Sequence, residues 1–372
     1  MDEWNGEINY MKIMLYTNKM VSGGAERVIA NLANYLSQEN EVILMTYIKG
    51  KSFYELDKKI KFYSCLNKEI TKKRFDNIIA LKNIYSIVKS ENPDIILSFL
   101  ETPNLHMLLL KKILKVPLII SVRNDPSQIF NTRLKKLTLK YLYKRADGLV
   151  LQTKEAKEYF NETIQKKSVI IPNPVNPKFL KEPYCGQREK KIVSVGRLVN
   201  QKQQDVLIDA FEIVNKEYND YKLVIYGEGE LRNKLQEKIN DIGLNEKISL
   251  PGNVANIENE IYKYSMFVLS SKYEGMPNSL MEAMALGIPA ISTDCPCGGP
   301  KFLIDNNKNG ILVKVNDKKE MAKAMKKIIQ DSKFANFIAK NASERLKELE
   351  PGKINKIWQN FILEIYSKNN RR

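Results

Sequence analysis

Short apolar runs alternate with amphipathic helical patterns along almost the whole chain, and this alternation limits the fold more than any other feature of the sequence. Strand–helix alternation predicts an α/β protein with parallel sheets and helices on both faces of each sheet. The apolar runs form two series. The expected strands are Tyr10–Thr17, Glu41–Ile48, Lys59–Leu66, Asp94–Leu100, Pro117–Arg123, Gly148–Thr153 and Ser168–Pro172, followed by Lys191–Arg197, Tyr221–Gly227, Ile248–Pro251, Met266–Ser271, Pro289–Asp294 and Gly310–Val315.

A proline-rich, charged segment separates the two series. Residues 172–191 contain four prolines, which is typical of a linker. With 372 residues, the chain has room for two doubly wound domains. We expect the first domain over residues 1–175, a linker over 176–190 and the second domain over 191–352. An amphipathic helix over 353–368 needs a partner surface, which either domain can provide.

The composition excludes several protein classes. With 43% hydrophobic and 28% charged residues, the chain is expected to fold rather than to remain disordered. Four cysteines are too few for a disulfide scaffold, and none forms a CxxC pair with zinc spacing. The polar start of the chain resembles no secretory signal, and no run of 18 apolar residues occurs. We therefore expect a cytoplasmic protein.

The net charge of +17 indicates an anionic partner. Residues 1–184 hold 30 basic and 19 acidic residues, and residues 111–145 hold ten basic residues and one acid. Within that stretch, residues 132–145 have the pattern of a basic amphipathic helix that can lie on anionic lipid. A general lysine preference of the genome, or an ordinary helix with its leucines in the core, explains the same pattern.

Two strand ends carry residues suited to an anionic ligand. Gly23 and Gly24 follow the first expected strand and precede a helix, where free N–H groups attract negative charge, although the spacing is not that of a dinucleotide fingerprint. Arg197 and Lys202 follow the first strand of the second series. A planar guanidinium and a point-charge ammonium in one strand-to-helix loop suit a diphosphate.

The stretch from Ser270 to Asp294 carries the most informative pattern. Glu274 and Glu282 are eight residues apart, so in one continuous helix they would lie about 12 Å and about 80° apart. That separation does not match the paired carboxylates of a glycoside hydrolase. We expect Glu274 in a loop and Glu282 within a helix, each contacting a different part of one extended ligand, since carboxylates accept hydrogen bonds from sugar hydroxyls.

The turn between these glutamates is expected to open a helix. Pro277 suits the first helical turn, and Asn278 and Ser279 can satisfy the early N–H groups. Two other glycine-rich loops are weaker signals. Gly227 and Gly229 are expected to form a turn, and the backbone at Gly298–Gly299 is expected to meet a ligand. A metal at Cys295 and Cys297 lacks further ligands, since the chain has one histidine, His106, and no D-x-D triplet.

Taken together, these motifs resemble the GT-B glycosyltransferases of family 4, retaining transferases of cell-envelope and polysaccharide synthesis. The resemblance spans nearly the whole chain. It implies two Rossmann-like domains facing a central cleft, with the C-terminal helix crossing back to the first domain. The matching pieces are SGGAERV, IPNPV, VGRLVNQK, YGEGELR and YEGMPNSLMEAMALGIPAIS, the last with the E-x₇-E pair at Glu274 and Glu282.

The resemblance also implies roles for single residues. Arg197 and Lys202 would hold the donor diphosphate, Glu274 would lie beside the donor sugar, and these three form the catalytic set. Glu282 would bind the ribose hydroxyls. The remaining donor-binding residues that it implies are Gly24, Gly227, Gly275, Met276, Pro277, Asn278 and Ser279.

One departure from the family pattern concerns a histidine that many members carry after the fifth strand, facing the donor sugar. Here Arg123 or Asn124 occupies that place. We expect these two residues and Gly23 near the sugar or the acceptor, with Arg123 facing the cleft. His106 lies on the preceding helical segment and is not a convincing substitute.

By this resemblance the protein transfers a hexose or N-acetylhexosamine, with retention and without a metal, from a nucleotide sugar expected to be UDP-linked. The expected acceptor is a lipid-linked glycan of capsule, O-antigen, exopolysaccharide or glycoprotein glycan synthesis, reached from the inner face of the membrane as a peripheral protein. Two alternatives remain. A sugar-nucleotide epimerase would need acid–base groups that are not evident, and a nucleic-acid binder would need a recognition module that is not evident.

Overall fold

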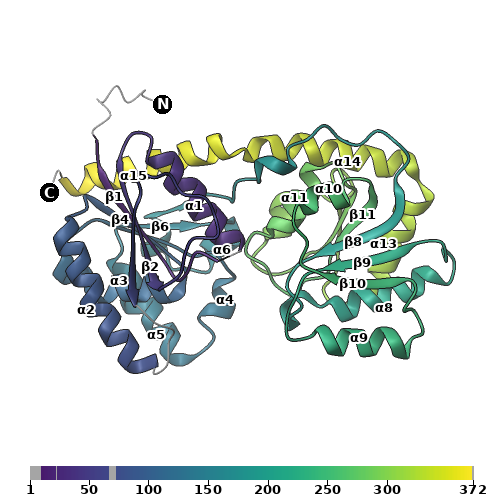
Figure 1. The fold of residues 1–372 in the computed structure, drawn as a ribbon, viewed down its shortest axis with the longest axis horizontal. Coiled ribbons are helices and arrows are strands. Elements are labelled where there is room, and N and C mark those ends of the chain that lie inside the picture. Colours follow the sequence, from purple (N-terminus) through teal and green to yellow (C-terminus); the bar gives the residue numbers. More distant parts are fainter. Residues whose placement is uncertain (1–9, 22, 67–72, 371–372) are drawn as a thin grey trace. The chain divides into compact units, whose positions relative to one another are not determined.

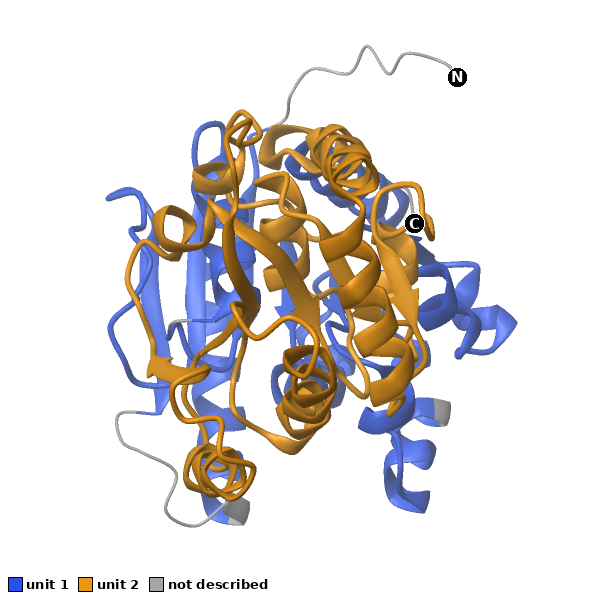
Figure 2. Cartoon of the chain, turned by 90° about the vertical axis from the view of Figure 1, so that its right-hand side faces the viewer, with its two compact units in different colours: residues 1–171, 354–372 blue, residues 172–353 orange. Residues whose placement is uncertain are grey.

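The computed structural model describes residues 10–21, 23–66 and 73–370. The polar start of the chain and Ser22 of the first glycine motif lie outside these residues. Figure 2 shows two compact units. Unit 1 comprises residues 1–171 and 354–372, and unit 2 comprises residues 172–353.

Unit 1 is built on a parallel sheet in which seven described strands follow the order β3-β2-β1-β4-β5-β6-β7. The central strand β1 is buried along almost its whole length, and Ile13 pairs with Val42 on one side and Ile95 on the other. Strands buried on both faces need helices on both sides of the sheet. The strands are β1 (Lys12–Thr17), β2 (Glu41–Ile48), β3 (Lys61–Leu66), β4 (Ile95–Phe99), β5 (Leu118–Ser121), β6 (Gly148–Leu151) and β7 (Ser168–Ile170).

Helices flank this sheet (Figure 1). Helix α1 shows why they pack there, since Val28, Ile29 and Leu32 recur at helical spacing and are buried, while its other face is polar. The helical segments of unit 1 are α1 (Gly24–Leu36), α2 (Lys73–Glu91), α3 (Glu101–Leu114), α4 (Pro126–Ile129), α5 (Arg133–Tyr141), η1 (Tyr143–Arg145), α6 (Lys154–Glu158) and α7 (Glu162–Gln165).

Unit 2 repeats this plan with six described parallel strands in the order β10-β9-β8-β11-β12-β13. Its core includes Ile192 of β8, Phe211 of α8 and Met325 of α13, all fully buried. The strands are β8 (Glu189–Val195), β9 (Lys222–Tyr226), β10 (Ile248–Gly252), β11 (Tyr264–Leu269), β12 (Ala290–Thr293) and β13 (Ile311–Val313). The helical segments are η2 (Pro177–Phe179), η3 (Asn200–Lys202), α8 (Gln204–Asn215), α9 (Arg232–Asp241), α10 (Ile257–Ile261), α11 (Asn278–Ala285), α12 (Gly299–Leu303), α13 (Lys318–Gln330), α14 (Ser332–Leu346) and η4 (Lys347–Leu349).

The last helix, α15 (Pro351–Asn370), leaves unit 2 and belongs to unit 1 from Ile354 onward. Trp358 is fully buried, with its ring centroid 5.5 Å from that of Phe99 in β4. Gly148 of β6 lies so close to this helix that an added Cβ would sit 2.8 Å from Cζ of Phe361. The expected return of the C-terminal helix to the first domain is therefore confirmed.

Several strands are shorter in the structure than the sequence predicted. The strand expected over Lys59–Leu66 begins at Lys61, because the Ile60 N–H donates to the Asp57 carbonyl in a turn. The strand expected to reach Arg123 ends at Ser121, and the one expected to reach Arg197 ends at Val195. Both arginines therefore lie in loops beyond their strands.

Candidate active site

The predicted donor-site residues of unit 2 lie at the carboxyl edge of its sheet. Strands β8 and β11 are neighbours, so the loops that follow them meet at one place. The first loop carries Arg197 and Lys202, and the second carries Glu274. The structure thus brings residues 72 positions apart in sequence into direct contact.

Lys202 and Glu274 form a largely buried ion pair. The Lys202 ammonium donates to Oε1 of Glu274 at 2.5 Å, and the two side chains are 14% and 9% exposed. Ser271 donates to the same oxygen at 2.6 Å. Hydrogen bonds between charged partners are short and strong, so both side chains are fixed in position. The Ser270 hydroxyl also donates to the Lys202 carbonyl, which anchors the lysine backbone.

Arg197 differs from Lys202 in its surroundings. Its side chain is exposed, and its carbonyl accepts a hydrogen bond from Nε2 of Gln204 at 2.9 Å. The loop backbone is therefore anchored while the guanidinium lies toward solvent. Arg197 is thus an exposed cation in the same loop as Lys202, whose own charge is paired with Glu274, and an anionic group can approach its planar guanidinium.

The loop between the two glutamates opens helix α11. Pro277 occupies the N-cap rather than the first helical turn, so that expectation was wrong by one residue. The expected cap by Asn278 is also wrong, since no side chain caps this helix and Oδ1 of Asn278 accepts a hydrogen bond from Asn173. Glu274 lies in the loop and Glu282 within α11, as the sequence predicted, and both are buried.

Asn173, at the start of unit 2, donates hydrogen bonds to residues of the loop that precedes α11 and of the first turn of that helix. Its N–H donates to the Met276 sulfur at 3.1 Å, and its Nδ2 donates to Oδ1 of Asn278 at 2.8 Å. Sequence reasoning gave Asn173 no role, although it lies in the quoted IPNPV segment. Its partners are more than 100 residues away in sequence, and no local signal indicates them.

Close packing between loops explains two glycines of unit 2, Gly227 and Gly299. Gly227 has φ +136°, and a side chain there would clash with the Gly196 carbonyl. A side chain at Gly299 would likewise clash with the Gly275 carbonyl. Gly299 therefore packs against the loop that carries Glu274. That the Gly298–Gly299 backbone meets a ligand stays a prediction.

In unit 1, Gly23 and Gly24 open α1. Gly24 is the first helical residue, and Gly23 is its N-cap with an extended backbone. The Gly23 N–H donates to the Tyr54 hydroxyl at 3.0 Å, and that hydroxyl donates to the Gly23 carbonyl at 2.7 Å. Tyr54 therefore fixes the position of this loop at the end of β1.

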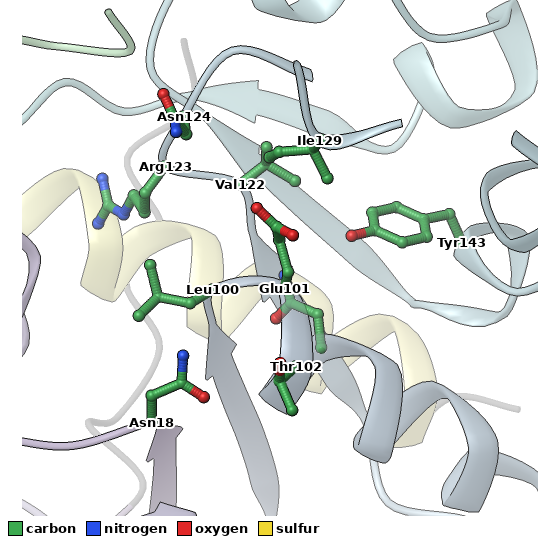
Figure 3. A pocket seen from close by; sticks show the side chains of 10 residues that line it. Asn18, Leu100, Glu101, Thr102, Val122, Arg123, Asn124, Ile129 and Tyr143 are labelled. Carbon is green, nitrogen blue, oxygen red and sulfur yellow. The ribbon is translucent and has the colours of Figure 1, made fainter. Parts of the chain in front are cut away.

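A pocket of about 280 Å³ lies at the carboxyl ends of β1, β4 and β5, and all of its lining residues belong to unit 1 (Figure 3). It includes Arg123 and Asn124, which the sequence indicated. It also includes Glu101, Asn104 and Tyr143, which the sequence analysis missed. The complete lining is Asn18, Leu100, Glu101, Thr102, Asn104, Val122, Arg123, Asn124, Ile129 and Tyr143.

Leu100, on the wall of this pocket, has a strained backbone. Its φ of 74° and ψ of 167° lie in a region that only glycine ordinarily adopts. Such a conformation costs about 1–3 kcal/mol and tends to persist at functional sites. Leu100 is the N-cap of α3, so Glu101 is the first helical residue and follows the end of β4 by one residue.

Arg123, which the sequence analysis expected to face the cleft, packs against aromatic rings of unit 1. Its guanidinium carbon lies 5.5 Å from the Phe99 ring centroid and 5.4 Å from the Trp358 ring. Burial lowers the pKa of Arg123 to about 9, so the side chain is still a cation at neutral pH. Arg123 thus stacks on two aromatic rings of unit 1, one of them from α15.

His106 is not placed to act as a sugar-facing histidine. Its Nδ1 lies 2.9 Å from the Tyr16 hydroxyl and its Nε2 lies 3.3 Å from Oδ1 of Asn77, within the interior of unit 1. Burial lowers the pKa of His106 to about 4, so the ring is neutral at pH 7.

The basic segment of unit 1 forms helix α5 and exposes apolar side chains. Leu134, Leu137 and Tyr141 are 75%, 50% and 61% exposed. Lys135 and Lys136 are exposed on the same helix. The interpretation that places these leucines in the core is therefore wrong for Leu134 and Leu137.

Comparisons with known proteins agree with this architecture. The sequence model described as Glycosyltransferase Family 4 matches residues 22–179, and that described as Glycosyl transferases group 1 matches residues 178–345. A solved structure from Anabaena, Alr3699/HepE in complex with UDP, superposes with a TM-score of 0.78 at 16% identity, covering 95% of this chain and 100% of that one. The fold is therefore the GT-B fold.

Two relatives are similar over most of their length. One, from Campylobacter jejuni, is named a GalNAc-α-(1→4)-GalNAc-α-(1→3)-diNAcBac-PP-undecaprenol α-1,4-N-acetyl-D-galactosaminyltransferase and is 29% identical over 95% of this chain and 99% of its own. The other, an uncharacterized glycosyltransferase of Methanocaldococcus jannaschii, is 31% identical over 75% of this chain and 81% of its own. The chain belongs to glycosyltransferase family 4 and is a glycosyltransferase. Among the described helices, none is both long and apolar enough to cross a bilayer.

Proposed function

We propose that the protein transfers a hexose or N-acetylhexosamine from a UDP-sugar to a lipid-linked glycan, with retention at the anomeric carbon. The observation that carries this proposal is the Lys202–Glu274 pair, fixed beside Arg197 at the carboxyl edge of unit 2's sheet. The Campylobacter relative, named for a lipid-linked acceptor, and the UDP complex of the Anabaena protein support the acceptor and donor classes.

In this proposal Lys202 and Arg197 stabilise the negative charge that develops on the diphosphate as the sugar bond breaks. Electrostatic groups positioned before the reaction contribute most because they need no reorganisation at the transition state. Glu274, already oriented by Lys202 and Ser271, accepts hydrogen bonds from the donor sugar hydroxyls. Since two cations supply the charge, we propose that transfer needs no divalent metal.

The rest of the donor site follows the same edge. Glu282 binds the ribose hydroxyls, and the start of α11 receives the phosphates, because its early N–H groups have no side-chain cap. A same-face reaction, in which the leaving phosphate oxygen takes the acceptor proton, accounts for retention without a covalent enzyme intermediate. The other proposed donor contacts in unit 2 are Gly227, Gly275, Met276, Pro277, Asn278 and Ser279, and a further one, Gly24, belongs to unit 1.

The proposed acceptor is lipid-linked, so the enzyme must reach a membrane surface. We assign this contact to α5 of unit 1, where exposed Leu134 and Leu137 lie among basic residues. Apolar side chains enter the interface while basic side chains meet anionic headgroups. We propose that the protein acts as a peripheral protein on the cytoplasmic face of the membrane.

The direct test measures thermal stability with a panel of UDP-, GDP- and dTDP-sugars, followed by transfer assays on lipid-linked oligosaccharides. We expect UDP-sugars to raise the melting temperature, because ligand binding stabilises the native state by RT ln(1 + [L]/Kd). Both the shift and the transfer are expected to persist in EDTA. Stabilisation by none of the nucleotides would contradict the donor site, and loss of transfer that Mn²⁺ restores would contradict the metal-free mechanism.

A further inference from the structure

We propose that Glu101 is a specificity residue that makes the unit 1 pocket accept an uncharged sugar and reject an anionic one. This inference rests on the proposed glycosyltransferase function and names the chemistry of the acceptor end of the reaction. In this pocket the carboxylate accepts hydrogen bonds from hydroxyl groups of the acceptor sugar, and its charge repels acidic sugars.

The position of Glu101 supports this role. It is the first residue of α3, and its side chain is exposed and lines the pocket. Figure 3 shows its carboxylate directed into the space bounded by Val122, Ile129 and Tyr143, with the Tyr143 hydroxyl pointing toward it. Burial raises the pKa of Tyr143. A hydrogen bond with the Asn104 side chain lowers that pKa in part, and the charge of Glu101 raises it, so the phenol stays protonated and can donate.

Asn104 provides a second, independent sign of a ligand. The residue is fully buried, and Oδ1 of its side chain has no hydrogen-bond partner among the described residues. Its Nδ2 donates to the Ser121 carbonyl at 2.9 Å, which fixes the orientation of the amide. A buried acceptor without a donor is costly, and a ligand hydroxyl would satisfy it.

The charges of the pocket favour an uncharged ligand. Arg123 is the one basic residue among the ten lining residues. Its guanidinium packs on Phe99 and Trp358, and in Figure 3 it points away from the Glu101 carboxylate. An anionic sugar entering this pocket would therefore meet the negative charge of Glu101 without a facing cation, and like charges held close together lower affinity.

The shape and lining of the pocket suit one sugar ring. Its volume of about 280 Å³ is close to the lower end of ligand pockets, which begin at roughly 300 Å³. Leu100, Val122 and Ile129 give it apolar wall that can pack against the C–H face of a pyranose. The amide side chains of Asn18 and Asn124 add donors and acceptors for further hydroxyl groups.

The test compares two probes that differ at C6, methyl galactoside with a hydroxymethyl group and methyl galacturonide with a carboxylate. Their dissociation constants are measured by NMR titration on the full-length protein without donor. In the wild type we expect the uronide to bind at least about tenfold more weakly than the galactoside. In Glu101→Gln, which keeps the shape and an acceptor oxygen but removes the charge, we expect the ratio to fall to within about threefold.

Glu162→Gln is the matched control, since Glu162 is also an exposed first residue of a helix in unit 1 and does not line the pocket. It should keep the wild-type ratio. Because selectivity is a ratio within one protein, partial unfolding of a variant does not change it. An unchanged ratio in Glu101→Gln would overturn the proposal, as would a wild type that binds neither probe or binds both equally.

These outcomes are distinguishable from failure of the proposed function. If glycoside selectivity depends on Glu101 but no UDP-sugar stabilises the protein, the donor assignment is wrong and the role of Glu101 in the pocket is supported. If UDP-sugars stabilise the protein but the two glycosides bind equally, the donor assignment is supported and the proposed role of Glu101 is wrong.

Discussion

The ammonium of Lys202 lies 2.5 Å from Oε1 of Glu274, and Ser271 donates to the same carboxylate oxygen. The lysine is therefore already positioned before a donor binds. A cation fixed beside a leaving diphosphate is worth more in the transition state than in the ground state. We expect Lys202→Ala to lower kcat/KM by at least about 10²-fold, the usual effect of losing one such group.

Steady-state kinetics at saturating and at low donor concentration measure this effect. Lys216→Ala, which removes an exposed lysine that pairs with Glu212 on the surface of unit 2, is the control and should be silent. The double variant with Arg197→Ala should lose less than the product of the two single effects, because both cations serve one leaving group. Near-wild-type transfer by Lys202→Ala would remove the assignment.

Arg123 and Trp358 should be energetically coupled. The guanidinium lies over the indole, and the contact is buried, where such interactions are worth about 2 kcal/mol. We expect Trp358→Leu and Arg123→Ala each to lower the free energy of unfolding. In a double-mutant cycle, urea denaturation should yield a coupling energy of about 1–2 kcal/mol. Strictly additive effects would show that the stacking contributes nothing.

His106 should make the protein sensitive to mild acid. Its pKa is lowered from 6.5 to about 4 in the folded state, so protonation favours the unfolded chain. The stabilising contribution is complete above pH 6.5 and is lost as the pH falls from 6.5 to 4. A shift of this size corresponds to a loss on the order of 3 kcal/mol.

Urea denaturation at several pH values between 7 and 4 measures this loss. His106→Gln has no titratable ring and should show a flatter dependence in that interval, although it loses some packing at every pH. If the wild type and the variant lost stability in parallel as the pH falls, other groups would be responsible.

Helix α5 should bind anionic vesicles through its basic and apolar side chains. Each basic residue near an anionic surface contributes about 1 kcal/mol. Reversal of Lys135 and Lys136 to glutamate should therefore weaken co-sedimentation with phosphatidylglycerol vesicles by at least about tenfold. The control reverses Lys58 and Lys59, two adjacent exposed lysines of the same unit, and should bind as the wild type does. Equal binding by both double variants would exclude α5 as the contact.

The sequence predicted the elements that depend on local pattern. Parallel strands and amphipathic helices follow from hydrophobic periodicity, and Glu274 and Glu282 could be placed in a loop and a helix because Pro277 marks the boundary between them. Strand ends were less predictable. Arg123 and Arg197 follow apolar runs closely, and only backbone hydrogen bonding decides where a strand stops.

Contacts between distant segments could not be predicted in the same way. Asn173 contacts Met276 across 103 positions, and nothing in the local sequence indicates the pairing. Glu101 could have been predicted as a site residue, since it follows a predicted strand of the first series and ligands bind at that edge of an open sheet. The contact of Arg123 with Trp358 could not be predicted, because Trp358 comes from the far end of the chain.

The course of α15 also has a consequence for synthesis on the ribosome. Residues up to Ile171 emerge first, but Trp358 and Phe361, which pack on Phe99 and Gly148, are added almost 190 residues later. Domains generally fold in order as they are made. Here the unit that is made first is completed last, because α15 adds its contacts with Phe99 and Gly148 only after unit 2 has been synthesised.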